Sequence, residues 1–241
     1  MYTSASMIGQ EHLYLSLSPF TVISFFVPDM HDSMLPYLDS KKKETLPKGH
    51  VFYNTGDTTK NIFYLNKGIA METIMNENGL EKDFLIVPPY PLGFHYCAHE
   101  QPIFPCTKTY TECEVYRFTY DEFLSMMQEN KQLLKSILKL ISLDFRLANS
   151  PGMQNYSLSS YEKVCQTILS YFIGAKYDPY MKKLKLTQEL AARLTGVHRV
   201  SAVRAIQKLK ADKIIAYEKN KLRLLDYEKL CNIAYEKYPI K

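Results

Sequence analysis

The stretch LTQELAARLTGVHRVSAVRAIQKL, from Leu186 to Leu209, decides how the C-terminal part of this chain folds. Apolar residues recur at helical spacing on both sides of Gly196, which predicts two short amphipathic helices joined by a tight turn. The apolar positions are Leu190, Leu194 and Val197 before or at the turn, and Val203, Ile206 and Leu209 after it. This arrangement is typical of a helix-turn-helix, whose second helix enters the major groove of DNA.

The outward face of the second helix is polar and basic. Its residues are His198, Arg199, Ser201 and Arg204. A small helical hairpin with a solvated charged face would show the same periodicity, so the flanking sequence matters. After the helices, Ile214–Tyr217 and Leu222–Leu225 predict a two-stranded hairpin, or wing, with Lys219 and Lys221 near its tip.

The charge of the chain is unevenly distributed. Residues 151–241 hold 17 Lys and Arg against 8 Asp and Glu, whereas residues 1–150 hold 13 against 17. A basic C-terminal part joined to a mildly acidic N-terminal part indicates that the C-terminal part meets a polyanion such as DNA.

Between Leu46 and Phe118 short apolar runs alternate with turn signals such as Thr55-Gly56-Asp57 and Asn78-Gly79. The Asn-Gly pair is typical of a tight hairpin turn. Regularly spaced short strands of this kind predict a small antiparallel barrel or jelly roll.

A long helix is expected from Asp121 to Asn149, because its apolar residues follow a heptad. The a positions are Phe123, Asn130, Ile137 and Asp144, and the d positions are Met126, Leu133, Leu140 and Leu147. We expect this seam to join two copies of the chain as a coiled coil. A second stripe, made of Met127, Leu134, Leu138, Ile141 and Phe145, is available to cover the barrel. The alternative is a helix that only packs on the sheet of its own chain.

The sequence therefore predicts an α+β protein in three segments. Residues 1–120 form an effector-sensing β-roll, residues 121–150 a dimerisation helix that ends in a hinge at Ser150-Pro151-Gly152, and residues 151–241 a winged helix-turn-helix.

The five cysteines are irregularly spaced without a CxxC pair, so neither a zinc site nor a disulfide framework is expected. Pro19 interrupts the apolar run Leu13–Val27, which is too short to span a bilayer, and a cytoplasmic protein is expected.

The order of these parts resembles the cAMP receptor protein/FNR family of bacterial transcription regulators. The resemblance covers Leu46 to Leu225. It rests on Pro47-Lys48-Gly49, Thr55-Gly56-Asp57 and Ile62-Phe63-Tyr64-Leu65 followed by Gly68, on Asn78-Gly79 and Pro91-Leu92-Gly93, and on the gapless match of Thr187–Leu209. Gly196-Val197-His198 before a Val looks most like the subgroup that senses chlorinated phenols in halorespiration. The family implies a cyclic-nucleotide-binding-like roll, a homodimer, an activator that contacts RNA polymerase, and no enzymatic activity.

The resemblance also assigns contacts to DNA. Arg199, Val200 and Arg204 occupy the positions that read base edges in the family. An Arg can bind guanine O6 and N7, whereas a Val can only contact a thymine methyl, so an inverted repeat richer in A·T is expected. The remaining expected contacts are Thr187, Gln188, His198, Ser201, Lys219 and Lys221. Thr187 can serve equally well as a plain helix cap.

The signal is not expected to be one of the family's usual cofactors. The chain has no Arg between Leu92 and Arg117 to hold a phosphate, and its first cysteine is Cys97, so neither cAMP nor an iron–sulfur cluster is expected. We expect a small aromatic, anionic effector at the junction of roll and long helix, and no cofactor or metal. The candidate contacts are Tyr90, Tyr96, Lys108 and Tyr110.

Three alternatives stay open from the sequence. One is a haem sensor with His95 and Cys97 as ligands. Another is a cupin-like metalloenzyme using His95, His99 and Glu100. The third is a constitutive DNA-binding protein whose pocket has lost its ligand.

Overall fold

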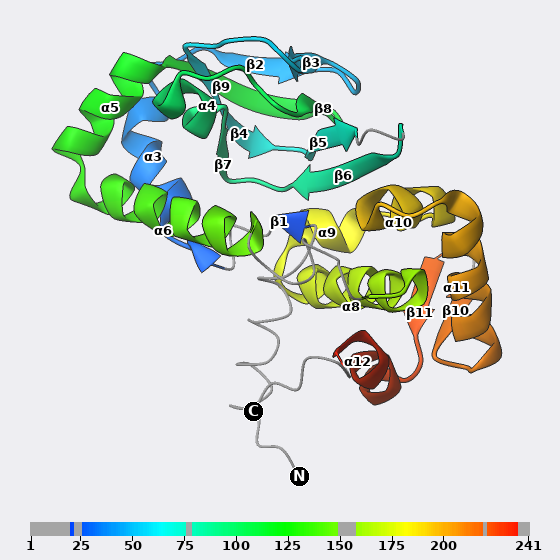
Figure 1. Ribbon diagram of the computed structural model, residues 1–241. Helices are drawn as coiled ribbons and strands as arrows, with labels where there is room; N and C mark the ends of the chain where they lie inside the picture. The colour runs from blue at the N-terminus through cyan, green and yellow to red at the C-terminus, as the bar shows by residue number, and fades with distance from the viewer. Residues whose placement is uncertain (1–19, 22–25, 76–78, 149–157, 219–220, 236–241) are drawn as a thin grey trace. The chain divides into compact units, whose positions relative to one another are not determined.

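The computed structural model describes residues 20–21, 26–75, 79–148, 158–218 and 221–235 (Figure 1). Its first strands are β1 (Phe20–Thr21), β2 (Lys43–Leu46), β3 (Val51–Tyr53), β4 (Asn61–Lys67), β5 (Ala70–Met75), β6 (Glu81–Ile86), β7 (Tyr90–Leu92), β8 (Cys106–Thr109) and β9 (Cys113–Thr119). The helices of this part are α3 (Met30–Leu38), α4 (Phe94–His99), α5 (Tyr120–Glu129) and α6 (Lys131–Ala148).

The C-terminal part is mostly helical. It consists of α8 (Ser160–Tyr177), α9 (Pro179–Lys183), α10 (Gln188–Thr195), α11 (Arg199–Ala211), β10 (Ile215–Glu218), β11 (Lys221–Leu224) and α12 (Tyr227–Tyr235). In the part of the chain that the structure describes, no helix is both long and apolar enough to cross a membrane.

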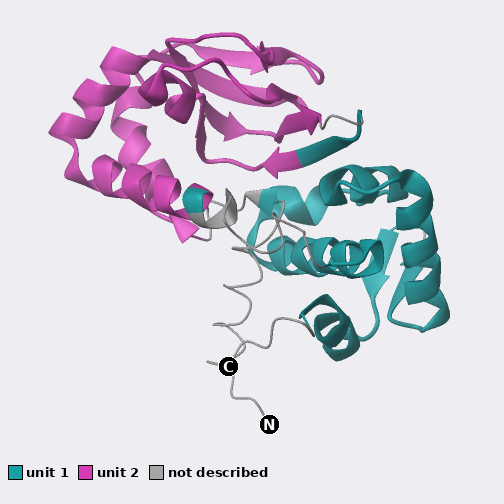
Figure 2. Cartoon of the chain, viewed as in Figure 1, with its two compact units in different colours: residues 1–20, 76–83, 145–241 teal, residues 21–75, 84–144 magenta. Residues whose placement is uncertain are grey.

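The chain divides into two compact units (Figure 2). Unit 1 comprises Met1–Phe20, Asn76–Asp83 and Phe145–Lys241, and unit 2 comprises Thr21–Met75 and Phe84–Asp144. The hinge at Ser150-Pro151-Gly152 and most of the run Leu13–Val27 lie outside the described residues. The division into residues 1–120, 121–150 and 151–241 stays a prediction.

Unit 2 is built on antiparallel strands. The strand order is β2-β9-β4-β7 in one sheet and β1-β6-β5-β8-β3 in the other, although residue 20 of β1 and residues 81–83 of β6 are assigned to unit 1. β4 pairs with both β9 and β7, while β8 pairs with β3 and β5. Burial alternates along β4, where Ile62 and Tyr64 are fully buried, and the rings of Phe94 on α4 and Phe123 on α5 lie 5.5 Å apart. The predicted α+β fold with an N-terminal antiparallel roll is confirmed.

Two glycines hold turns between these strands. Gly68 has a φ of +93°, and a Cβ there would lie 2.8 Å from the Cα of Cys113, so only glycine fits between β4 and β5. Gly79 has a φ of +73°, as expected for the hairpin before β6, whereas Asn78 lies outside the described residues.

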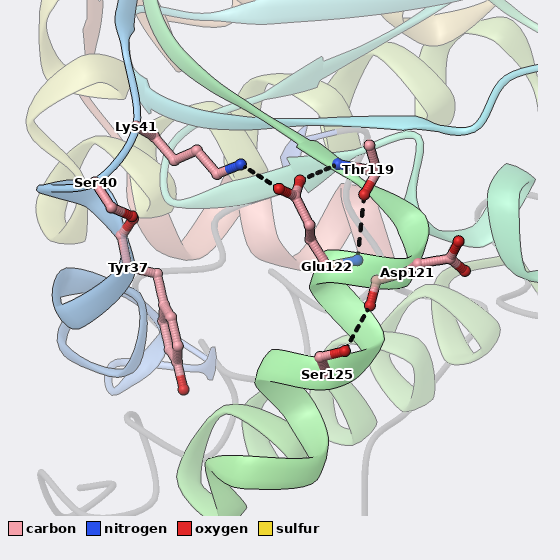
Figure 3. A network of polar contacts seen from close by, with 7 residues as sticks. All are labelled: Tyr37, Ser40, Lys41, Thr119, Asp121, Glu122 and Ser125. Atoms are coloured by element: carbon pink, nitrogen blue, oxygen red, sulfur yellow. Dashed lines mark hydrogen bonds and ion pairs between the residues drawn. The ribbon is translucent and has the colours of Figure 1, made fainter.

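A capping box fixes the beginning of α5 (Figure 3). The Thr119 side chain accepts a hydrogen bond from the Glu122 amide, and the Glu122 carboxylate accepts one from the Thr119 amide. Lys41 lies 2.6 Å from the same carboxylate, which ties the chain before β2 to this helix end. These contacts hold the pKa of Glu122 below its usual value, with the Lys41 hydrogen bond as the main cause.

The predicted single helix from Asp121 to Asn149 is interrupted at Asn130. This residue has extended backbone angles, and its side-chain oxygen accepts hydrogen bonds from the amides of Gln132 and Leu133, so it caps α6. Its side-chain amide donates to the Ser33 carbonyl of α3. The prediction that Asn130 sits in a coiled-coil seam is therefore wrong, because its side chain is used to end one helix and begin the next.

The apolar stripes of this region are not covered as predicted. The proposed seam is buried inside a single chain: Phe123, Met126, Leu133, Ile137 and Leu140 are exposed by 0, 6, 0, 1 and 2%. In the second stripe Met127 is buried at 7% exposure, whereas Leu134, Leu138 and Ile141 face outward and are exposed by 39, 54 and 43%. The prediction that the first stripe joins two copies is wrong. A helical periodicity shows that an apolar face exists but does not say what covers it.

Unit 1 is organised around α8. A capping box between Ser159 and Glu162 begins this helix, and Gln166 near its middle donates a hydrogen bond to the Ala234 carbonyl of α12 at 2.8 Å. Val164, Cys165 and Ile168 of α8 are fully buried, which gives the helices of the C-terminal part a common core.

Candidate nucleic-acid interface

The first helix of the motif, α10, begins and ends where the sequence predicts. The Thr187 hydroxyl accepts a hydrogen bond from the Leu190 amide at 3.1 Å, so Thr187 caps the helix. Gly196 ends it with a φ of +67°, a conformation that glycine adopts without strain. Leu190 and Leu194 are buried, exposed by 4 and 1%, as predicted for the inner face.

The second helix, α11, separates its residues by face. Ala202, Ala205, Ile206 and Leu209 are buried against the rest of unit 1. Arg199, Val200 and Arg204 are exposed, and neither arginine forms an ion pair with a described residue. Val200 is 61% exposed, which is unusual for a branched apolar side chain. An exposed helix face with two arginines around an apolar residue is suited to the edges of base pairs.

The other predicted contacts lie around these two helices. His198 immediately precedes α11 and is exposed, Ser201 and Gln188 are half-buried, and Thr187 is exposed. Lys219 lies outside the described residues. Lys221 is exposed at the start of β11, which pairs antiparallel with β10 as the predicted wing, and Glu218 opposite it pairs with Arg223 at 2.9 Å.

An ion pair that the sequence patterns did not predict holds α10 within unit 1. Arg193 places Nη2 at 2.9 Å from Oδ1 of Asp83 and Nε at 2.6 Å from Oδ2, and Glu81 lies 3.0 Å from the same guanidinium. The Asp83 side chain is only 1% exposed. The hydrogen bond to Asp83 raises the pKa of Arg193 above its usual value. No local signal finds this pair, because its members are 110 positions apart.

In unit 2, two carboxyl groups, those of Glu72 and Asp144, lie near the candidate effector contacts Tyr90 and Tyr96. The Tyr90 hydroxyl donates to Oδ2 of Asp144 on α6 at 3.1 Å, and Thr107 donates to the Glu72 carboxylate at 3.4 Å. Burial raises the pKa of Glu72 to about 7, and the charge of Asp144 contributes. Burial likewise raises the pKa of Asp144 to about 7. The heptad pattern placed Asp144 in a coiled-coil seam, whereas its carboxylate bonds within its own chain.

The structure does not bring the other two effector candidates to this group. Thr107 turns its side chain toward Glu72, so Lys108, the next residue of β8, points to the opposite face of the sheet. Tyr110 lies after β8, where Lys48 is 5.7 Å from the centre of its ring. Two carboxyl groups beside Tyr90 and Tyr96, with Lys108 on the other face, disfavour an anionic ligand at this place.

The residues of the haem and metalloenzyme alternatives lie on or after α4. Burial lowers the pKa of His95 to about 4, and its ring packs against Tyr96 at 4.2 Å. The Cys97 thiol lies 3.6 Å from the Asn61 carbonyl, and burial raises its pKa to about 11. Among the described residues, no group of three or more His, Cys, Asp and Glu is placed to hold a metal ion.

Comparison with known proteins agrees with the geometry of unit 1. Residues 162–233 match the model of the Crp-like helix-turn-helix domain. A search among curated protein sequences finds no match.

Solved structures share the fold at low identity. The chain is similar to the c-di-GMP responsive global regulator CLP from Xanthomonas campestris, with 15% identity, 80% of this chain and 98% of that chain covered, and a TM-score of 0.64. It is similar to CprK in complex with OCPA, with 14% identity, 82% and 93% covered, and a TM-score of 0.62. It is also similar to a mutant of CooA from Carboxydothermus hydrogenoformans, with 14% identity, 83% and 90% covered, and a TM-score of 0.68.

At these identities the solved structures establish the fold, and they do not single out one subgroup. Over residues 162–233, the C-terminal part of the chain is thus similar to the Crp-like helix-turn-helix domain.

Proposed function

We propose that the protein is a homodimeric transcription regulator that binds an inverted-repeat operator through α10 and α11 and responds to a small organic molecule in unit 2. The observation that carries this proposal is the exposed Arg199–Val200–Arg204 face of α11 inside a domain that matches a Crp-like helix-turn-helix. Such a regulator acts in the cytoplasm, where it meets the chromosome, and as an activator it also contacts RNA polymerase.

The bases that it reads follow from the three exposed side chains. Arg199 and Arg204 suit guanine O6 and N7, and Val200 suits a thymine methyl group, so the half-sites are expected to carry an A·T pair beside the arginine contacts. Thr187 and Gln188, at the N-terminus of α10, are proposed to contact phosphate together with His198, Ser201 and the wing lysines Lys219 and Lys221.

Binding-site selection from random duplexes tests this base preference. We expect an inverted repeat whose half-site centres lie about 34 Å apart, one turn of the double helix. Val200→Glu should move the preference at one position toward G·C, and Arg204→Ala should weaken binding by about 1–3 kcal/mol and relax one base. Lys229→Ala is a control, because this lysine pairs with Asp226 and is not among the proposed contacts. An asymmetric selected site would contradict the proposal.

The dimer is proposed to form through the outward stripe of α6, with Leu134, Leu138 and Ile141 as its core. These positions are spaced by four and three residues, as in a two-helix coiled coil, and each is more than a third exposed in one protomer. Leu138→Asp combined with Ile141→Asp should give a folded monomer in analytical ultracentrifugation. Lys139→Asp, on the same helix beside the stripe, should remain a dimer. A wild-type monomer at micromolar concentration would contradict the proposed dimer.

The effector is proposed to bind beside Tyr90 and Tyr96 in unit 2. Because Glu72 and Asp144 lie in the same place, we expect neutral or cationic aromatic molecules to bind better than the anionic ones that the sequence suggested. Calorimetry with a matched series, an aryl acid, the corresponding alcohol and the corresponding amine, measures this order directly. Tighter binding of the acid than of the alcohol and the amine would contradict the expected order.

A further inference from the structure

Four lysines of unit 1 surround one hollow, and three of them are not among the proposed DNA contacts. Lys182, Lys183 and Lys185 come from α9 and the segment after it, and Lys221 comes from the wing. The hollow has a volume of about 630 Å³, and its other walls are Tyr171, Pro179, Leu184, Leu186 and Leu222. All four lysines are exposed.

The backbone that carries these lysines is firmly held. The Asp178 carboxylate accepts hydrogen bonds from the amides of Tyr180 and Met181 and thereby caps α9. The Tyr171 hydroxyl donates to the Leu184 carbonyl at 2.8 Å. Leu184 and Leu186 are buried, with Lys185 exposed between them, so the chain presents this lysine outward by simple alternation.

No carboxylate of the described residues neutralises the four lysines. The ion pairs of the described chain use other side chains, and Glu218, the strand partner of Lys221, is bound to Arg223. Asp178, the acid nearest in sequence to α9, is 2% exposed and is used as the helix cap. The hollow is therefore a place of uncompensated positive charge above an apolar floor, along which the lysine stems can lie.

The hollow also continues the proposed DNA-binding surface. Lys185 precedes Thr187 by two residues, and Thr187 caps the helix whose N-terminus is proposed to contact phosphate. Lys221 belongs to the wing. Lys182 and Lys183 lie on α9, which precedes the N-terminal end of α10, whereas α11, the helix proposed to read bases, follows its C-terminal end (Figure 1).

We infer that this lysine hollow binds the phosphate backbone of the duplex outside the half-site that α11 reads. The inference rests on the proposed function and extends it, because it adds Lys182, Lys183 and Lys185 to the DNA contacts. Lysines suit this task, since an ammonium group binds phosphate as a point charge and carries no base specificity. Each phosphate that is neutralised releases condensed counterions, so these contacts appear in the salt dependence of binding.

Fluorescence anisotropy of two duplexes tests the inference. One duplex contains only the selected inverted repeat, and the other adds about one helical turn, ~10 base pairs, on each side. Binding is measured between about 50 and 200 mM salt for the wild type and for Lys182→Gln combined with Lys183→Gln. The charge-matched control is Lys42→Gln combined with Lys60→Gln, two exposed lysines of unit 2. Thermal unfolding establishes that all three proteins are folded.

On the long duplex, the slope of log affinity against log salt should fall by about 0.9 for each phosphate that a substituted lysine no longer neutralises, up to about 1.8 for the double variant. The control should keep the wild-type slope, and on the short duplex both variants should match the wild type. An unchanged slope for the double variant on the long duplex would overturn the inference, as would an equal reduction on both duplexes, which places the lysines inside the half-site. Failure of the wild type to bind any duplex would instead overturn the proposed function.

Discussion

Each unit contains carboxyl groups removed from solvent, but among the described residues a cation lies against Asp83 in unit 1 and none lies against Glu72 and Asp144 in unit 2. In unit 1, Asp83 lies against the guanidinium of Arg193, and its charge is matched. In unit 2, burial raises the pKa values of Glu72 and Asp144, the charge of Asp144 adds to the rise for Glu72, and hydroxyl donors oppose it. No cation is among the causes of either shift. The same residue types therefore serve as a fixed ionic contact in one unit and as groups that titrate near neutrality in the other.

The largest change in the free energy of unfolding is expected at the ion pair of Arg193 with Asp83. Arg193→Met leaves Asp83 buried without its cation, and we expect a loss of about 3–5 kcal/mol in the free energy of unfolding of unit 1, measured in urea. Combining Arg193→Met with Asp83→Asn should recover part of that loss, because the uncompensated charge is gone. Arg204→Met, on the exposed face of α11, is the control and should change stability by less than about 0.5 kcal/mol. A small loss for Arg193→Met alone would show that the ion pair with Asp83 is not maintained in solution.

For unit 2 we predict how the free energy of unfolding depends on pH. Glu72 and Asp144 have pKa values of about 7 in the folded chain, above their ordinary values of 4.5 and 3.8, so the folded state binds more protons between about pH 4 and pH 7. Their contribution to stability is therefore present at low pH, is lost as the pH rises through about 7, and is constant above that. The loss is on the order of 2 kcal/mol after allowance for partial exposure to solvent.

Glu72→Gln combined with Asp144→Asn should remove this pH dependence. The difference between the wild-type and variant unfolding free energies, measured from pH 4 to pH 8, isolates the pair from all other titrating groups. Parallel curves for the two proteins would mean that the carboxyl groups are solvated rather than buried.

The smallest change in the free energy of unfolding is expected from the hydrogen bond between Tyr90 and Asp144 in unit 2. Tyr90→Phe removes the donor to Asp144 and should cost about 0.5–1.5 kcal/mol, more at pH 8 than at pH 5, because the bond is stronger to an ionised carboxylate. Tyr96→Phe is the matched control, since its hydroxyl forms no hydrogen bond with a described residue. Equal costs at both pH values would indicate that Asp144 keeps one protonation state throughout.

Local sequence was sufficient for the helix-turn-helix. Thr187, Gly196 and the spacing of Leu190 and Leu194 each act within a few residues, so the cap, the turn and the inner face could be predicted one by one. The outward positions of Arg199 and Arg204 followed from the same periodicity, whereas Val200 was assigned through the family resemblance. The exposed face of a helix is fixed once its buried face is known.

Contacts between distant segments could not be predicted in this way. Asn130 fits a heptad, yet α3 offers it the Ser33 carbonyl, and its side chain caps α6 instead. Asp144 also fits the heptad, but Tyr90 lies 54 positions earlier and supplies its hydrogen bond. By local sequence each residue fits both a coiled-coil position and a polar contact within the chain, and only the tertiary structure decides which one forms. Lys108 lies on the face of β8 opposite to Thr107 and so away from Glu72, and the face that a strand residue occupies was not fixed by the local sequence.

The break at Asn130 has a consequence for gene control. It leaves α6 with 18 residues, a length of about 27 Å at 1.5 Å per residue, so the proposed dimer contact spans little more than two heptads. So short a contact holds two protomers weakly by itself, and the fraction of protein in dimers then depends on its concentration in the cell. Where most of the protein is monomeric, operator occupancy rises with the square of protein abundance. Transcription from such a promoter would respond to a twofold change in expression of the regulator more steeply than in proportion.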